Sequence, residues 1–229
     1  MKKTHNCDLQ SCSLCRGCLP EWLPALQEKR QTFHFEKGEI IFNEGEEVKG
    51  IFFLITGKVK VHTRWGRDKS LIVRFVKPGD IFGHRGLGES KYFISATTVE
   101  STTVCFIDYD FFLSTIKINH DYAFHLLMFL AEELNESERK MKNMTHMPVK
   151  GRIAYCLLKL HKKFGIDNNG TLLIDVSRQD ISSYAGTTYE TAFRTMSELV
   201  DTGTIGFNGK KILLKDITGL QKLYEEMIP

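Results

Sequence analysis

Ser177–Leu199 constrains the fold more than any other segment, because it predicts two short helices that meet at a glycine. Ser177 can cap the first helix, since its hydroxyl oxygen can accept a hydrogen bond from an otherwise unpaired backbone N–H. Gly186 suits the turn, because a left-handed backbone costs glycine little. Thr187 or Thr188 can cap the second helix. The segment therefore predicts a helix-turn-helix.

The second predicted helix has two different faces. Ala192, Met196 and Leu199 recur at helical spacing and are expected to point inward. In a plain helical hairpin, Glu190 and Arg194 would be an ordinary surface ion pair four residues apart. We favour DNA recognition, because the turn glycine, both caps and an outward polar cluster coincide in one short segment. The candidate DNA-binding residues are Ser177, Arg178, Thr188, Tyr189, Glu190, Phe193 and Arg194.

Composition narrows the class of protein. The 229 residues can bury a sizeable core, most simply in two domains, and 42% hydrophobic with 26% charged residues is typical of a globular protein. No apolar run approaches the roughly 20 residues that span a bilayer, and no apolar signal-peptide segment is present, so we expect a cytoplasmic protein with no membrane partner. Net charge is +3, and residues 149–229 hold 11 Lys or Arg against 9 Asp or Glu, a difference of +2. Charge alone therefore does not support DNA binding.

The residue pattern divides the chain into four parts. Residues 1–20 are rich in cysteine. Residues 21–118 contain a short helix and then short β-rich runs separated by glycines, which is typical of a jelly roll. Residues 119–147 have helical periodicity, and residues 148–229 contain the helix-turn-helix. The predicted fold class is α+β: an N-terminal β jelly roll, a long helix and a C-terminal winged helix-turn-helix.

The last part also carries signals for a wing. Pro148 suits the first turn of a helix over Val149–Phe164. Thr171–Val176 is predicted as a strand. Two further β-rich runs flank Asn208-Gly209, which is a strong hairpin turn.

The long helix has a heptad pattern. Leu127, Leu134 and Met141 are seven residues apart, and Leu130, Ser137 and Met144 form a second row offset by three. Such a seam, with charged flanks, is typical of helices that pair in a coiled coil. The alternative is a long helix that only covers the barrel. We expect a homodimer, with interface residues Leu127, Leu130, Leu134, Met141 and Met144.

The chain resembles the Crp/Fnr superfamily of bacterial regulators, typified by the cyclic-AMP receptor protein and the fumarate-nitrate reductase regulator. Four blocks in the same order carry the resemblance: Lys37–Glu46, Gly57–Val61, Pro78–Gly83 and Arg178–Arg194. The resemblance implies a cyclic-nucleotide-binding-like sensor barrel in residues 21–118 and a dimer on an inverted repeat of double-stranded DNA. It also implies RNA polymerase as a partner. Glu190 and Arg194 would read base edges, which suits their hydrogen-bonding groups.

The resemblance places the effector pocket around Gly83, His84, Arg85 and Ser95. Relatives that bind cyclic nucleotides have a Glu for the ribose where this chain has His84, and an Arg for the phosphate where it has Ile94. A buried phosphate without its guanidinium partner loses a strong charge-assisted pair. Cyclic AMP is therefore disfavoured as the effector, although Arg85 could hold another anion.

Six cysteines suggest a different signal. Cys7, Cys12, Cys15 and Cys18 are closely spaced, and in a cytoplasmic protein such a cluster favours a metal site over disulfides. The resemblance implies a 4Fe-4S cluster held by three N-terminal cysteines and one barrel cysteine, with which Cys105 aligns. We therefore expect Cys12, Cys15, Cys18 and Cys105 as ligands, with Cys7 as an alternative. The spacing departs from the family pattern, since only two residues separate Cys15 from Cys18. Cys156 is expected in a helical core.

Other functions stay open at this point. The N-terminal cysteines could hold a structural zinc ion or be free redox-sensing thiols, and the barrel could take another small molecule or none. An electron carrier or enzyme that uses the cysteines ranks low, because the sequence shows no catalytic pair and such a protein would not need the helix-turn-helix. We therefore expect a non-enzymatic, homodimeric transcriptional regulator that responds to oxygen or redox state.

Overall fold

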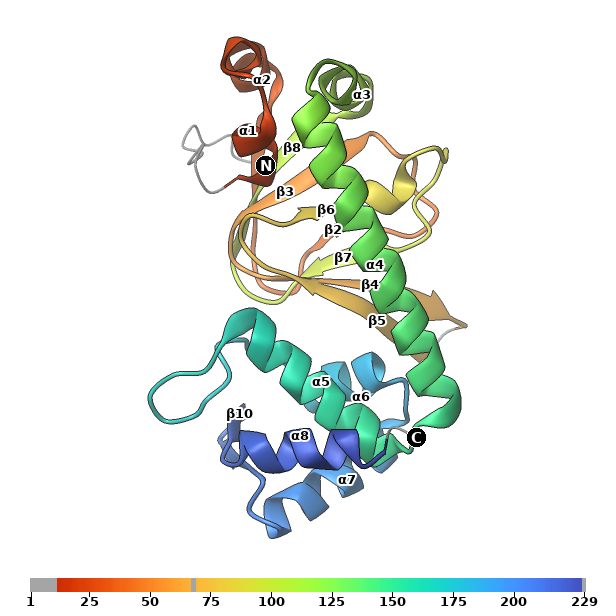
Figure 1. The fold of residues 1–229 in the computed structure, drawn as a ribbon, viewed down its shortest axis with the longest axis vertical. Coiled ribbons are helices and arrows are strands. Elements are labelled where there is room, and N and C mark those ends of the chain that lie inside the picture. Colours follow the sequence, from red (N-terminus) through yellow and green to blue (C-terminus); the bar gives the residue numbers. More distant parts are fainter. Residues whose placement is uncertain (1–11, 67–68, 228–229) are drawn as a thin grey trace. The chain divides into compact units, whose positions relative to one another are not determined.

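The computed structural model describes residues 12–66 and 69–227, and Figure 1 shows the course of the chain through its elements. Cys7, the alternative metal ligand, lies outside the described residues. The chain divides into two compact units, Met1–Arg64 with Val73–Asn135 and Trp65–Ile72 with Glu136–Pro229. None of the helices in the described part of the chain is long and apolar enough to cross a membrane.

Two four-stranded sheets form the β-roll, and only the last residue of β4 and the first part of β5 fall outside the first unit. The first sheet has the order β1-β8-β3-β6 and the second β2-β7-β4-β5. The strands are β1 (Gln31–Phe35), β2 (Ile40–Phe42), β3 (Gly50–Thr56), β4 (Val59–Trp65), β5 (Lys69–Val76), β6 (Ile81–Phe82), β7 (Ser95–Thr98) and β8 (Thr102–Asp108). This arrangement confirms the predicted N-terminal β domain.

The first sheet buries both of its faces. Successive side chains on a strand point to opposite faces, so β3 supplies Phe52 and Leu54 to the interior between the sheets. Ile51 and Phe53 point the other way, into a second core. Phe53 lies directly opposite Cys105 in the β3–β8 pairing, which places Cys105 in the second core as well.

Short helices of the same unit supply the rest of the second core. They are α1 (Ser13–Gly17), the 3-10 turn η1 (Pro20–Trp22), α2 (Leu23–Lys29) and α3 (Tyr109–Ile118), and they are followed by the long helix α4 (His120–His146). Asp108 caps α3 by accepting hydrogen bonds from the backbone N–H groups of Asp110 and Phe111. Leu14, Leu26, Phe112 and Tyr122 are buried in this core.

The second unit contains α5 (Val149–Phe164), α6 (Arg178–Ala185), α7 (Tyr189–Asp201), β9 (Ile205–Asn208), β10 (Lys211–Leu214) and α8 (Ile217–Glu225). It confirms the predicted C-terminal helix-turn-helix and hairpin. The strand predicted at Thr171–Val176 is wrong. Only Thr171 and Leu172 make isolated bridges, because the chain bends away at Leu173 after the Leu172 N–H donates to the Ile212 carbonyl.

Candidate functional site

The turn between α6 and α7 forms through local hydrogen bonds. The Ser177 hydroxyl accepts from the Asp180 backbone N–H, and the Asp180 carboxylate accepts from the Ser177 N–H, both at 3.0 Å. This reciprocal capping box starts α6. Gly186 ends α6 with φ 64° and ψ 49°, a left-handed conformation that side chains disfavour. A Cβ there would also lie 2.8 Å from Cε of Met144.

Helix α7 presents the predicted polar pair to solvent. Thr188 caps α7 by accepting from the Thr191 N–H at 3.2 Å. Ala192, Met196 and Leu199 are buried beneath the helix, as their spacing predicts. Glu190 and Arg194 are exposed, and within the described residues no ion pair joins them. Their charged groups are therefore available to a partner outside the second unit.

Aromatic side chains lie beside this pair. Tyr189 and Phe193 are 42% and 45% exposed, and their rings stack with centroids 6.3 Å apart. The Arg178 guanidinium, at the start of α6, lies 5.5 Å from the centre of the Phe193 ring and 4.4 Å from that of Phe207 in β9. α6, α7 and the β9–β10 wing are thus joined around one arginine.

Helix α4 carries an exposed apolar stripe. Leu127, Leu134 and Met141, one row of the predicted seam, are each at least 60% exposed. The other row differs, since Leu130 packs partly against the second core and Met144 is half-buried over Gly186. Two further exposed residues, Phe124 and Met128, lie near Leu127 on α4. Neither residue belongs to the predicted heptad rows, although Phe124 and Met128 are four residues apart in the sequence.

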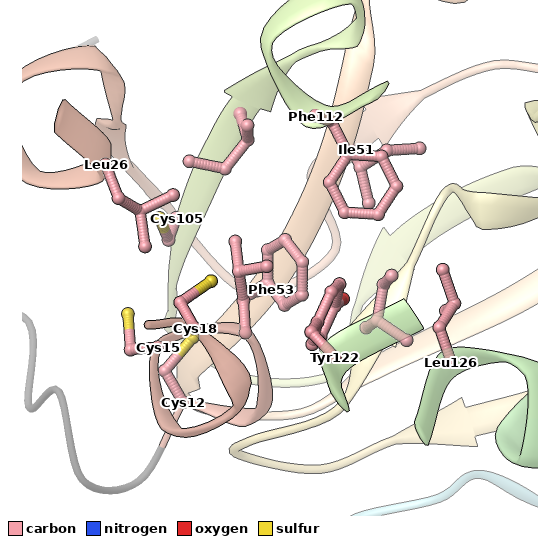
Figure 2. Packing of buried hydrophobic residues seen from close by; sticks show 13 residues of the cluster. Cys12, Cys15, Cys18, Leu26, Ile51, Phe53, Cys105, Phe112, Tyr122 and Leu126 are labelled. Carbon is pink, nitrogen blue, oxygen red and sulfur yellow. The ribbon is translucent and has the colours of Figure 1, made fainter. Parts of the chain in front are cut away.

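Four cysteines from distant parts of the chain gather in the second core of the first unit. Cys12, Cys15, Cys18 and Cys105 are all buried there. Figure 2 shows Cys12, Cys15 and Cys18 close to one another, at and beside α1, with Cys105 nearby on β8. Burial, together with the nearby Cys12, raises the pKa of the Cys18 thiol to about 11. Burial and the same three N-terminal cysteines hold the Tyr122 pKa well above its usual range.

The segment that carries the N-terminal cysteines is anchored to α3 and to the start of α4. The Leu19 N–H donates to the Asn119 side-chain oxygen at 2.6 Å, and Trp22 Nε1 donates to the Thr115 hydroxyl at 3.1 Å. Gly17 packs directly on Tyr122 of α4, where a Cβ would lie 2.9 Å from a ring carbon. The cysteine-bearing segment is therefore in direct contact with the start of α4.

The donor set suits a soft metal centre. Thiolates are the ligands that iron–sulfur clusters and zinc require, and burial excludes water from them. Within residues 12–66 and 69–227, however, no group of three or more His, Cys, Asp or Glu side chains is arranged to hold a metal ion. The four thiols are gathered but do not form a coordination geometry. Cys156 is separate, buried in α5 of the second unit as predicted, where burial raises its pKa.

The predicted effector pocket contains two buried polar side chains, His84 and Ser95. Gly83 has φ 80° and starts the 3-10 turn η2 (His84–Gly86). His84 is buried, and burial together with Arg74 and Arg85 lowers its pKa to about 3, so its ring is neutral. Ser95 is also buried, and its hydroxyl accepts from the Glu44 N–H at 3.0 Å.

Two arginines beside that turn share one carboxylate of α4. Glu133 lies 3.2 Å from Arg74 and 3.5 Å from Arg85, and Arg74 also lies 3.5 Å from Asp80. Phe129 packs against both Arg74, at 5.3 Å, and His84, at 5.1 Å. Sequence reasoning missed Arg74 and Glu133. The one available signal was a charged residue between Val73 and Phe75 in an apolar strand.

Comparisons with known proteins agree with this architecture. Residues 32–119 match the cyclic nucleotide-binding domain family, and residues 151–223 match the Crp-like helix-turn-helix domain family. The cAMP-activated global transcriptional regulator CRP of Pasteurella multocida is 31% identical over 178 residues, covering 76% of this chain and 85% of that protein. A CRP-like cAMP-activated global transcriptional regulator of Mycobacterium tuberculosis is 27% identical over 211 residues, covering 91% and 94%.

Solved structures show the same fold. The structure of FixK2 from Bradyrhizobium japonicum superposes with a TM-score of 0.76 at 27% identity, covering 85% of this chain and 96% of that one. The structure of a CooA mutant from Carboxydothermus hydrogenoformans gives 0.73 at 19% identity, covering 87% and 90%, which supports the fold alone.

A sensor-type β-roll followed by an exposed DNA-reading helix defines a DNA-binding transcriptional regulator, and the matched relatives are regulators rather than enzymes. The chain belongs to the Crp/Fnr family.

Proposed function

We propose that this chain is a homodimeric regulator that reads an inverted-repeat operator and responds to oxygen or redox state through an iron–sulfur cluster. Cys12, Cys15, Cys18 and Cys105 would hold the cluster. The observation that carries this proposal is the burial of these four thiols, from two distant segments, in one core. A zinc site made only of N-terminal cysteines would not account for Cys105 in the same core.

The chain's own residues suggest how such a site would signal. When bound, the cluster supplies an oxidant-sensitive group. Ligation requires the thiols to lose their protons, and burial raises the pKa of Cys18 and so opposes this loss. Loading would therefore change the packing of α1. That change would reach α4 through Gly17 on Tyr122 and through the Leu19–Asn119 hydrogen bond.

The exposed stripe of α4 supports the homodimer. Phe124, Leu127, Met128, Leu134 and Met141 are large apolar side chains that α4 leaves exposed, and an exposed apolar patch marks a candidate interface. A second copy of α4 would bury it in a parallel seam. Two-fold symmetry then places two α7 helices on two half-sites, with centres about one DNA turn apart.

Recognition within each half-site would rest on α7. The Arg194 guanidinium can donate two hydrogen bonds to guanine O6 and N7, and the Glu190 carboxylate can accept from cytosine N4. Their exposure without mutual pairing supports this role. Ser177, Arg178 and Thr188 lie at the starts of α6 and α7, where contacts to phosphates would orient the unit. RNA polymerase would be the partner of the DNA-bound dimer.

Cyclic AMP is not the effector in this proposal. The Glu133 carboxylate already pairs with Arg74 and Arg85, and it would repel a phosphate brought beside them. The regulators from Pasteurella multocida and Mycobacterium tuberculosis are described as cAMP-activated. This chain would differ from them in its signal while keeping their fold.

Anaerobic reconstitution with iron and sulfide tests the sensor. The full chain should become brown and bind about four irons per chain. Cys105→Ser should abolish both the visible absorption and the iron, since a serine oxygen replaces a soft thiolate poorly. Cys156→Ser is the matched control, because that thiol is equally buried in the other unit, and it should leave the iron content unchanged. Cys7→Ser should also retain iron.

The same experiment distinguishes the rival sites. If Cys105→Ser still binds metal and that metal is zinc, the cluster proposal fails and a structural zinc site replaces it. If neither the original chain nor Cys105→Ser retains any metal, the cysteines act as thiols.

A further inference from the structure

The exposed side of α7 carries two parallel rows of side chains with different chemistry. Glu190 and Arg194 form a charged row, four residues apart. Tyr189 and Phe193 form an aromatic row with the same spacing, displaced by one residue along the helix. Both rings keep more than two-fifths of their surface exposed in the described structure. The helix thus offers an apolar strip directly beside its charged strip.

The aromatic row has a defined orientation. Tyr189 and Phe193 stack with an interplanar angle of 21°. The Arg178 guanidinium lies against the Phe193 ring and against Phe207, so contacts from α6 and the wing fix Phe193 from one side. An isolated exposed apolar residue would need no explanation. Two stacked rings, held by an arginine from another helix and continuous with the candidate base-reading residues, form a prepared surface.

We propose that Phe193 and Tyr189 determine specificity by contacting the C5-methyl groups of thymine bases in the major groove. This inference rests on the proposed recognition role of α7. The C5-methyl of thymine is the apolar group that base pairs present in the major groove, and an aromatic side chain is a suitable partner for it. The rings would therefore add A·T preference at positions next to the base pairs that Glu190 and Arg194 read.

Arg178 completes the arrangement. Its charge lies at the edge of the aromatic row that faces α6 and the wing, where a positive group would meet a DNA phosphate. Arg178 would thus act as a positioning residue, which sets the Phe193 ring through the cation–π contact and the register of α7 through the backbone. A surface for another protein would not need a charged base-reading row beside the rings.

The test removes single methyl groups from the DNA. Binding sites are first selected from random duplexes with the full-length chain, under conditions in which it binds. Each thymine of the selected site is then replaced by uracil, which keeps base pairing and removes only the C5-methyl. We expect about fourfold weaker binding at one or two thymines per half-site, as for burial of one methyl-sized group. Uracil at other positions should have no effect.

Substitutions on α7 then assign the effect to its side chains. At the thymine that Phe193 contacts, Phe193→Ser should bind the thymine and uracil duplexes equally, whereas Phe193→Leu should retain preference for thymine there. Tyr189→Ser provides a second, independent variant with its own affected thymine. Asp201→Asn, at the exposed end of α7, is the control and should retain the pattern of the original chain. Circular dichroism confirms that each variant is folded.

The outcomes separate this inference from the one on which it rests. If Arg194→Ala binds the selected site as well as the original chain does, the recognition role of α7 itself is wrong. If Arg194→Ala weakens binding to the selected site while no uracil substitution has an effect, recognition by α7 stands and the thymine contact is overturned. If every methyl-sensitive thymine stays sensitive in Phe193→Ser and also in Tyr189→Ser, the thymine contact is overturned as well.

Discussion

Arginine side chains have opposite surroundings in the two units of this protein. Arg194 of α7 is exposed, and within the described residues it pairs with no carboxylate of its own unit. Arg74 of the β-roll is buried, and together with Arg85 it shares the Glu133 carboxylate of α4. An unpaired exposed charge costs nothing until a partner arrives, whereas a buried charge must be satisfied within the fold. The first arrangement suits an external anion such as DNA, and the second leaves no charge for one.

Apolar side chains show the same contrast. The stripe Phe124–Met141 of α4 and the rings of α7 remain in water, although each could lower its free energy by burial. In the β-roll, Phe129 packs against Arg74 and against the neutral, buried His84. The apolar side chains of α4 and α7 are thus open to a partner, whereas Phe129 makes its contacts within the β-roll.

Leu134→Asp should have the largest effect, because it changes an exposed apolar residue of the α4 stripe. Leu134 is 60% exposed in the single chain and would be buried in the dimer, so the change places two unpaired carboxylates in the seam. We expect self-association to weaken at least about a thousandfold, or about 4 kcal/mol. Sedimentation velocity should show monomer, and operator binding should be lost. Leu173→Asp, at a leucine that is also exposed but lies outside α4, should remain a dimer. A dimeric Leu134→Asp would place the interface elsewhere.

Glu133→Ala tests the buried ion pairs of the β-roll. The change leaves the Arg74 and Arg85 guanidinium groups without their shared carboxylate. We expect the free energy of unfolding of the β-roll to fall by about 2–3 kcal/mol, which is below the cost for a fully buried pair because 21% of Glu133 and 32% of Arg85 stay exposed. Urea denaturation, followed by Trp22 fluorescence in a Trp65→Phe background, measures it.

The matched variants are Glu133→Gln and Glu136→Ala. The glutamine keeps an acceptor oxygen and should lose less stability. Glu136 of α4 accepts hydrogen bonds from Tyr155 and Lys159 of α5, all within the second unit, so its removal should leave the β-roll transition unchanged. Equal losses in all three variants would show that the effect comes from α4 itself and not from the arginine pair.

The two regions also differ in how far the sequence predicts them. The helix-turn-helix lies within Ser177–Leu199, where caps, the turn glycine and the buried face depend on neighbours within a few residues, and the structure confirms these elements. The base-reading roles of Glu190 and Arg194 stay predictions. The Glu133 pairing joins residues far apart in sequence, and no local pattern encodes which carboxylate a buried arginine will meet.

The cysteine core could be predicted only in part, more than the Glu133 pairing and less than the helix-turn-helix. Spacing alone singled out the N-terminal cysteines, but Cys105 entered only through a family resemblance. Its place is set by strand register, because Cys105 faces the second core only while it pairs with Phe53. The strand predicted at Thr171–Val176 failed for a related reason: its residues are apolar enough for a strand, but only one of its two isolated bridges, Thr171 with Leu213, joins it to the hairpin. Pairing partners, which sequence does not show, decided both cases.

Taken per pH unit, the acid sensitivity of His84 is the smallest expected effect, and it tests the contrast between buried and exposed groups. Burial, Arg74 and Arg85 lower the His84 pKa to about 3, whereas the unfolded chain takes up the proton near pH 6.5. Between these values the unfolded state binds more protons, so the stability of the β-roll is complete above pH 6.5 and falls as the pH is lowered toward 3. The slope from this group should be about 1.4 kcal/mol per pH unit. Since carboxylates also contribute at acid pH, the measurement is the difference between the original chain and His84→Leu, with His34→Leu at a partly exposed site as the control. If His84→Leu retains the full slope of the original chain while His34→Leu does too, His84 is not held neutral in the folded protein, and the effector turn is more open to water than the burial of His84 indicates.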